Sequence, residues 1–115
     1  KKNTGLSAAR NIGMKNASGN FICFIDSDDW IENSMLEKLH NNIIGFNTDI
    51  SMCAVNIFDE NTQEIKDEQY FNFSIFPVTF ENKVFSYEDT KSFTMDIPVM
   101  AWNKMYSFNK RDTTV

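Results

Sequence analysis

One stretch of this 115-residue chain decides the fold: Phe21-Ile22-Cys23-Phe24-Ile25-Asp26-Ser27-Asp28-Asp29-Trp30. An apolar run leads directly into three carboxylates. A short, continuous run rich in aromatic and β-branched residues indicates a strand buried on both faces, which is typical of a parallel sheet covered by helices. We therefore expect an α/β fold with a mostly parallel sheet and this strand at its centre. Asp26 and Asp28 would lie at its carboxyl end, where open α/β sheets bind ligands.

The regions on either side of this strand are predicted to be helical. Residues 6–17 and 34–46 carry apolar side chains at helical spacing, and both helices are expected on the faces of the sheet. The first helix would place Arg10 on the same side of the sheet as the acidic cluster. Its packing face would combine small and apolar residues: Leu6, Ala9, Ile12 and Gly13.

The rest of the chain gives weaker signals. Asp49–Phe58 is predicted to form a second strand, and residues 59–63 to form a turn. Residues 70–80 are rich in aromatic side chains and are interrupted by a proline, which leaves an edge hairpin or a loop. A short helix is expected from Ser86 to Met95, and Val99–Tyr106 is predicted to be a strand.

Composition restricts the class of protein. The hydrophobic content of 42% indicates a globular chain, and the net charge of −5 argues against nucleic acid as a partner. No apolar run approaches the roughly 18 residues that cross a bilayer. We expect Cys23 and Cys53 to be buried free thiols of a reducing compartment, which predicts a cytoplasmic location. His40 is expected on the surface.

The acidic cluster has several chemical uses. Neighbouring carboxylates repel each other, and a divalent cation held by carboxylates and substrate phosphates would offset that repulsion. A calcium loop of the EF-hand type is excluded, because Trp30 and Ile31 stand where further ligands and a glycine are needed. A phosphatase of the haloacid dehalogenase type, with Asp26 as nucleophile, stays open. So do metal-dependent sugar transfer and a non-catalytic binding module that keeps a vestigial metal site.

Two adjacent segments resemble a known family. These are Asn3-Thr4-Gly5-Leu6-Ser7-Ala8-Ala9-Arg10-Asn11-Ile12-Gly13 and the run from Ala17 to Trp30. In spacing and residue type they resemble the middle of family-2 glycosyltransferases, which have the GT-A fold of nucleotide-diphospho-sugar transferases. A later segment, Trp102-Asn103-Lys104-Met105-Tyr106, resembles one in bacterial members that build surface polysaccharides.

The resemblance implies an activity and a role for each matching residue. The enzyme would transfer a sugar from a nucleotide-diphosphate donor to a glycan or lipid-linked acceptor, with inversion. Asp28 would ligate Mn²⁺ or Mg²⁺ on the donor diphosphate, and Asp26 would reach the ribose and the water shell of the metal. Arg10 and the backbone of Gly5 would contact the donor. Asp29 would support the site or face the sugar.

The resemblance also predicts what is missing. Residues 1–115 would be an internal fragment of one catalytic domain, truncated at both ends and inactive alone. The base that deprotonates the acceptor is not assigned, and Asp89 is a candidate whose simpler role is to cap a short helix. The parent enzyme is expected in the cytoplasm, with peripheral association at the inner face of the membrane.

Overall fold

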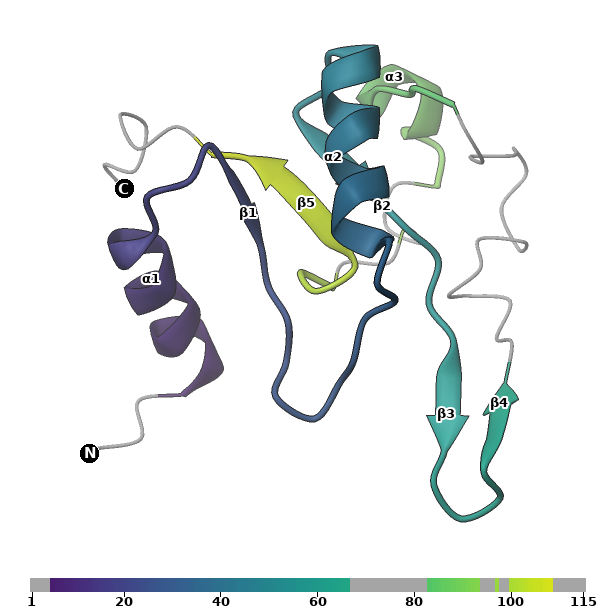
Figure 1. Cartoon of the computed structure of the whole chain (residues 1–115). Coiled ribbons are helices and arrows are strands. Elements are labelled where there is room, and N and C mark those ends of the chain that lie inside the picture. The colour runs from purple at the N-terminus through teal and green to yellow at the C-terminus, as the bar shows by residue number, and fades with distance from the viewer. Residues whose placement is uncertain (1–4, 67–82, 94–96, 98–99, 109–115) are drawn as a thin grey trace.

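The computed structural model of the chain describes residues 5–66, 83–93, 97 and 100–108 (Figure 1). The described elements are, in chain order, α1 (Leu6–Asn16), β1 (Phe21–Cys23), α2 (Met35–Phe46), β2 (Ile50–Met52), β3 (Ile57–Asp59), β4 (Glu64–Lys66), α3 (Tyr87–Thr90) and β5 (Lys104–Ser107). The two long helices match the predicted ranges to within one residue. The expected hairpin or loop at 70–80 lies outside the described residues.

The main sheet has the strand order β1-β5-β2, with β5 antiparallel to both neighbours. Cys23 pairs with Met105, and Met52 pairs with Lys104. Because β1 and β2 are both antiparallel to β5, they run in the same direction. Their carboxyl ends therefore lie at one edge of the sheet, where β5 begins.

The predicted sheet differs from the observed one in direction and in the place of β1. Every ladder in the described part of the chain is antiparallel, and β1 is an outer strand of the main sheet. The three residues of β1 are each partly buried. The strand is therefore less buried than the apolar run predicted, and such a run carries no information about the direction of the neighbouring strand.

The core lies where α2 packs across β2 and β5. Its fully buried apolar residues are Leu39 and Ile43 of α2 and Met105 of β5. Partly buried side chains pack against them: Phe21, Cys23, Met35 and Cys53. Burying an aliphatic side chain of this size contributes about 2 kcal/mol. The core therefore fixes β1, β2 and α2 around the first half of β5.

Helix α1 lies beside β1 and buries none of its residues (Figure 1). Leu6 and Ile12 are 57% and 55% exposed, and a Cβ added at Gly13 would meet no atom within 4 Å. The close packing predicted for this face is therefore not found among the described residues. The helix begins after Gly5, whose φ of +88° is a conformation that glycine adopts without strain.

The predicted second strand is divided in two. β2 ends at Met52, and the chain then leaves the main sheet to form β3, which pairs with β4 in a separate hairpin. The predicted turn after Phe58 is confirmed. Oδ1 of Asp59 accepts hydrogen bonds from the backbone N–H of Asn61 at 2.9 Å and of Thr62 at 3.3 Å. This local bonding is how aspartate stabilises a turn.

Candidate functional site

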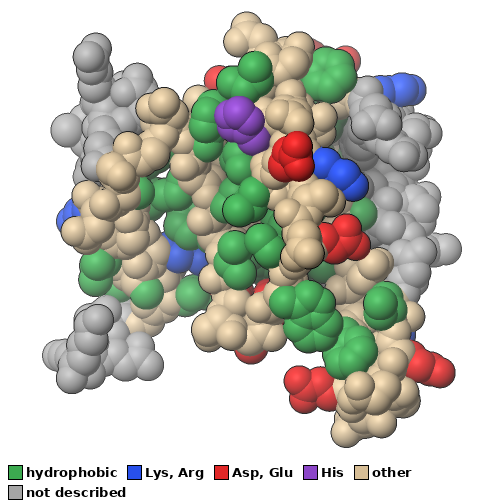
Figure 2. Space-filling model, viewed as in Figure 1, with side chains coloured by type: hydrophobic (Ala, Val, Ile, Leu, Met, Phe, Trp, Pro, Cys, Tyr) green, Lys and Arg blue, Asp and Glu red, His purple; other side chains and the backbone are tan. Residues whose placement is uncertain are grey.

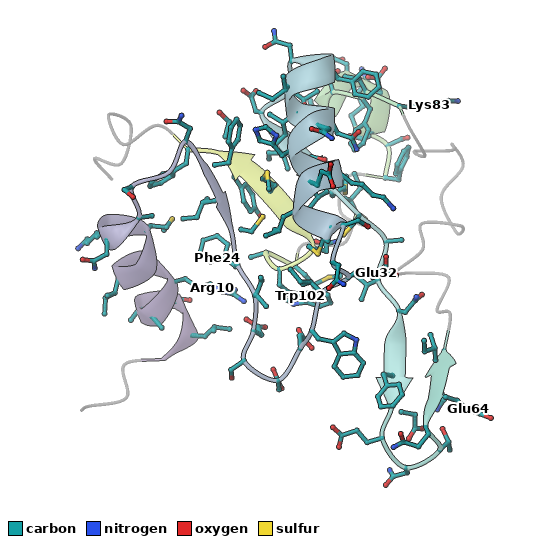
Figure 3. All side chains as sticks on the ribbon, in the orientation of Figure 1. Arg10, Phe24, Glu32, Glu64, Lys83 and Trp102 are labelled. Atoms are coloured by element: carbon teal, nitrogen blue, oxygen red, sulfur yellow. The ribbon has the colours of Figure 1, made fainter. Side chains whose placement is uncertain are left out.

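An ion pair links α1 to the segment that follows β1. Nη2 of Arg10 lies 3.0 Å from Oδ1 of Asp26, and the guanidinium lies 5.6 Å from the centroid of the Phe24 ring. Figure 3 shows Arg10 pointing from α1 towards Phe24. The structure therefore brings together Arg10 and Asp26, which are separated by sixteen positions in the sequence.

The ion pair leaves Arg10 with unused hydrogen-bonding capacity. Its Nε is buried and has no hydrogen-bond partner within the part of the chain that the structure describes. The side chains of Arg10 and Asp26 are 25% and 27% exposed, so both can still reach solvent. A guanidinium has five N–H donors in a rigid fork, which suits the oxygen atoms of a phosphate.

The other two carboxylates of the cluster face solvent. The backbone N–H of Asp29 donates to the carbonyl of Asp26 at 3.1 Å, which forms a turn that holds the three aspartates together. Partial removal from water raises the pKa of Asp29, and the charges of Asp28 and Asp26 raise it further. The loop therefore concentrates negative charge, and a bound cation would stabilise its ionised carboxylates.

The loop fits a divalent ion that takes few protein ligands. Among the described residues, no three His, Cys, Asp or Glu side chains are placed to hold a metal together. Mg²⁺ is usually bound by one or two carboxylates, with water and substrate phosphates completing its shell. Asp28 is exposed and free to be such a ligand, whereas Asp26 is already paired with Arg10.

A cavity of about 890 Å³ opens beside the acidic loop. Its walls come from the loop itself, the first turns of α2, the segment between β2 and β3, and the turn before β5. Asp28, Asp29 and Trp30 line it, as do Phe58 and Trp102. These segments meet because the carboxyl ends of β1 and β2 and the beginning of β5 lie at the same end of the main sheet. Figure 3 labels Trp102 and Glu32, two residues of the cavity wall.

The turn before β5 is fastened to the end of β2 by reciprocal hydrogen bonds. Nδ2 of Asn103 donates to the carbonyl of Cys53 at 3.1 Å, and the backbone N–H of Cys53 donates to the carbonyl of Asn103 at 3.0 Å. Asn103 is 1% exposed. Nζ of Lys104 donates to Oδ1 of Asn103 at 2.7 Å and to the carbonyl of Met100 at 2.6 Å. Burial lowers the pKa of Lys104.

Sequence reasoning did not assign Asn103 and Lys104 a role beyond their place in the Trp-Asn-Lys resemblance. Two polar residues inside the strand-like run Val99–Tyr106 were the available signal, because a polar residue within a buried strand needs a partner. Trp30 and Phe58 were also missed as a pair. Their rings pack edge to face with centroids 5.1 Å apart, and only the fold brings these two positions together.

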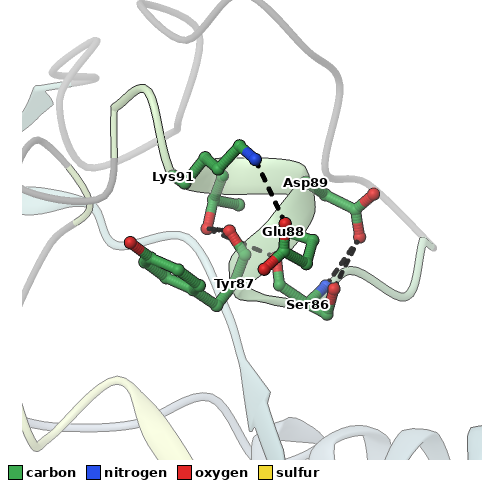
Figure 4. A network of polar contacts seen from close by, with 6 residues as sticks. Ser86, Tyr87, Glu88, Asp89 and Lys91 are labelled. Carbon is green, nitrogen blue, oxygen red and sulfur yellow. Dashed lines mark hydrogen bonds and ion pairs between the residues drawn. The ribbon is translucent and has the colours of Figure 1, made fainter.

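Asp89 lies in a capping box at the start of α3 (Figure 4). Its Oδ2 accepts hydrogen bonds from the backbone N–H of Ser86 at 2.8 Å and from the Ser86 hydroxyl at 3.2 Å. This is the capping role that competes with catalysis for this carboxylate. Asp89 does not line the cavity described above. Its assignment as a base stays a prediction.

The cysteines and the histidine lie close to their predicted places. Cys23 and Cys53 are free thiols, but both are half-buried rather than fully buried. Burial raises the pKa of each, and for Cys53 the neighbouring Cys23 adds to the effect. His40 lies on the exposed surface of α2, where it is the purple side chain in Figure 2. Its ring and that of Phe21 form a T-shaped contact, with the two ring centroids 4.9 Å apart.

Comparison with known proteins gives a consistent result. The model of Glycosyl transferase family 2 matches residues 1–111. Glycosyltransferase GlyA of Streptococcus pneumoniae is 36% identical over 115 residues, covering 92% of this chain and 15% of the relative. The putative glycosyltransferase EpsH of Bacillus subtilis is 33% identical over 92% of this chain and 29% of its own length.

A third relative has a named lipid substrate. The cholesterol galactosyltransferase of Borreliella burgdorferi is 30% identical over 91% of this chain and 30% of its own length. The chain thus spans less than a third of each of these three relatives. Among the described residues, no helix is long and apolar enough to cross a membrane.

Proposed function

The chain belongs to glycosyl transferase family 2, and from this premise we propose that it supplies the donor-binding part of an enzyme that transfers a sugar from a nucleotide diphosphate to an acceptor. The family implies the GT-A fold. The single observation that carries the proposal is that the Arg10–Asp26 ion pair stands at the start of the loop whose exposed carboxylate, Asp28, lines a cavity. Family membership also removes the reason to regard Asp26 as a phosphatase nucleophile.

The donor diphosphate would lie between Arg10 and Asp28. Arg10 would direct the solvent-exposed N–H groups of its guanidinium towards phosphate oxygens while its pair with Asp26 keeps the guanidinium in place. Asp26, with its carboxylate at the end of β1, would face the ribose. Gly5 has no side chain and a Cβ placed there would meet no atom within 4 Å, so a ligand could approach the backbone at the start of α1 closely.

Asp28, with Asp26 in support, would hold Mn²⁺ or Mg²⁺. Such an ion acts as a Lewis acid on the leaving diphosphate when it is bound. The residues of this chain would orient the donor so that its anomeric carbon faces the cavity. An acceptor hydroxyl would attack from the opposite side of the bond that breaks, with inversion at that carbon. Asp29 and Asp89 are the candidates to support or deprotonate the acceptor.

The acceptor is proposed to be a glycan or a lipid-linked sugar. The name of the borrelial relative, a cholesterol galactosyltransferase, supports a lipid-bearing acceptor. A lipid-linked acceptor would place the enzyme at the inner face of the membrane by peripheral association. The net charge of −5 supports the absence of nucleic acid among its partners.

We assign residues 1–115 to one catalytic domain that needs further segments for turnover. The support is that the chain spans 15–30% of the three relatives described above. Transfer requires the nucleobase and the diphosphate of the donor to be positioned together with the acceptor, and the described residues account for binding of the diphosphate. The 115-residue chain alone should therefore be inactive.

The experiment is a turnover assay with the full-length protein and a panel of nucleotide sugars. Release of the nucleoside diphosphate is measured with Mn²⁺, with Mg²⁺ and with a chelator. We expect release from one donor, restored after chelation by either ion, and no release by residues 1–115 alone. Release of inorganic phosphate from phosphomonoesters, without release of a nucleoside diphosphate from any sugar nucleotide, would overturn the proposal.

A further inference from the structure

We propose that the aromatic wall formed by Trp30 and Phe58 binds the acceptor as a neutral sugar ring, next to the carboxylate of Asp29. This inference rests on the proposed function, since it assigns the acceptor end of the same cavity. It names a class of substrate, a sugar without an acidic group, and two residues that select it.

The first argument is the exposure of Trp30. This side chain is 68% exposed although it follows the acidic loop directly and lines the cavity. Its ring is held by an edge-to-face contact with Phe58 of β3, with centroids 5.1 Å apart. A tryptophan that is fixed on one side and open on the other offers a flat apolar surface with a polar N–H at its edge. The C–H face of a sugar ring is complementary to that surface.

The second argument is the charge around this wall. Among the residues lining the cavity, the acidic ones outnumber the single cationic one, Lys38; the acids are Asp28, Asp29, Glu32 and Glu60. Carboxylates accept hydrogen bonds from sugar hydroxyls, and these charge-assisted bonds are stronger than neutral ones. The three acids other than Asp28, which would be neutralised by its cation, would repel a uronic acid or a phosphorylated sugar. The cavity therefore favours a neutral ring.

The third argument is continuity. Asp28 and Phe58 line one cavity, with Asp29 and Trp30 beside Asp28 in the same loop. A volume of about 890 Å³ is within the usual range of small-molecule sites. In the view of Figure 2, hydrophobic and acidic side chains lie beside each other towards the β3–β4 hairpin. A donor sugar at Asp28 and an acceptor ring at Trp30 would thus be neighbours.

The test is saturation-transfer NMR on the full-length protein, with the methyl glycosides of glucose, galactose, N-acetylglucosamine and glucuronic acid as probes. The variants are Trp30→Ala, Trp30→Phe and, as a matched control, Tyr87→Ala. Tyr87 is 65% exposed, belongs to α3 and does not line the cavity. Loss of one aromatic contact should weaken the binding of a neutral glycoside by about tenfold.

We expect wild type and Tyr87→Ala to bind at least one neutral glycoside and to discriminate against the glucuronide. Trp30→Ala should lose most of this affinity, and Trp30→Phe should recover part of it. Equal affinity of wild type and Trp30→Ala, equal binding of the glucuronide, or no binding of any glycoside by wild type would overturn the proposal.

Hydrolysis of the donor without acceptor, measured on the same samples, separates this inference from the proposed function. Tyr87→Ala, outside the cavity, should hydrolyse the donor at the wild-type rate. If wild type hydrolyses the donor and Trp30→Ala binds the glycosides as wild type does, the acceptor wall alone is wrong. If wild type hydrolyses no nucleotide sugar, the proposed function fails, whatever the glycosides do.

Discussion

Nη2 of Arg10 lies 3.0 Å from Oδ1 of Asp26, and this ion pair joins α1 to the acidic loop across sixteen positions of sequence. Since α1 buries none of its residues, the pair and the contact with Phe24 are the described links between this helix and the end of β1. The pair holds the Arg10 guanidinium beside the acidic loop, and its buried Nε has no hydrogen-bond partner among the described residues.

Replacing Arg10 by alanine should reduce donor affinity much more than stability. The ion pair is partly exposed, and such pairs contribute about 0–1 kcal/mol to folding. A charge-assisted hydrogen bond to a phosphate is worth about 1.5–3 kcal/mol, so donor affinity should fall by at least tenfold. Calorimetric titration with the nucleoside diphosphate and urea unfolding give the two quantities.

The matched control for that variant is Lys15→Ala, which removes an exposed basic residue of the same helix. It should leave donor affinity within about twofold of wild type, because an exposed charge away from a ligand is screened by salt. Equal losses of affinity in Arg10→Ala and Lys15→Ala would show that only the net charge of α1 matters, and would remove Arg10 from the site.

Asn103→Ala should be among the more destabilising substitutions near the cavity. The change leaves the carbonyl of Cys53 without its side-chain donor and removes one acceptor of the Lys104 ammonium, which keeps its bond to the carbonyl of Met100. Leaving buried partners unsatisfied costs about 1–3 kcal/mol for each group. Urea unfolding should therefore show a loss of about 2 kcal/mol or more. Asn41→Ala, on the exposed surface of α2, should show no loss; a similar loss in both variants would contradict the role of Asn103.

Asp29→Asn should stabilise the chain at neutral pH and not at acid pH. Partial burial and the charges of Asp28 and Asp26 raise the pKa of Asp29 from its ordinary value of 3.8. The folded chain therefore binds this proton more readily than the unfolded chain, so the ionised carboxylate opposes folding above the raised pKa. Below the ordinary pKa both states are protonated and the penalty disappears.

The melting temperatures of wild type and Asp29→Asn are measured between about pH 7 and pH 4, a range that descends to the ordinary pKa of carboxylates. The gap in melting temperature should narrow as the pH falls, and added salt at neutral pH should narrow it too. A gap that widens towards acid pH would mean that the carboxylate of Asp29 stabilises the fold, contrary to its position in the loop.

The sequence predicted the two long helices well, because the apolar residues of each repeat at helical spacing. The short helix expected from Ser86 to Met95 is helical only over Tyr87–Thr90 among the described residues. The range of α2 follows from apolar residues such as Leu39 and Ile43, which the core then buries. Strand direction and order could not be predicted in this way. The run Phe21–Ile25 is apolar whichever strand lies next to it, and only the pairing of Cys23 with Met105 shows that β5 is antiparallel.

The candidate site was predictable only in part, for a similar reason. Asp26, Asp28 and Asp29 lie within four positions of the sequence, so their proximity could be predicted without knowing the fold. Arg10 was expected on their side of the sheet, but its bond to Asp26 depends on how α1 meets β1. Trp30 and Phe58 come from a loop and a separate hairpin, and no local pattern connects them.

The central claim is that Asp28 holds a divalent cation on the diphosphate of the donor. The most direct measurement is the paramagnetic enhancement of water relaxation by Mn²⁺ in the full-length protein, with and without a nucleoside diphosphate, for wild type, Asp28→Ala and Glu88→Ala. Glu88 is an exposed carboxylate of α3 outside the cavity, so it serves as the control. We predict that the nucleoside diphosphate tightens Mn²⁺ binding in wild type and Glu88→Ala, and that Asp28→Ala loses this binding. Equal Mn²⁺ binding by all three proteins would contradict the account.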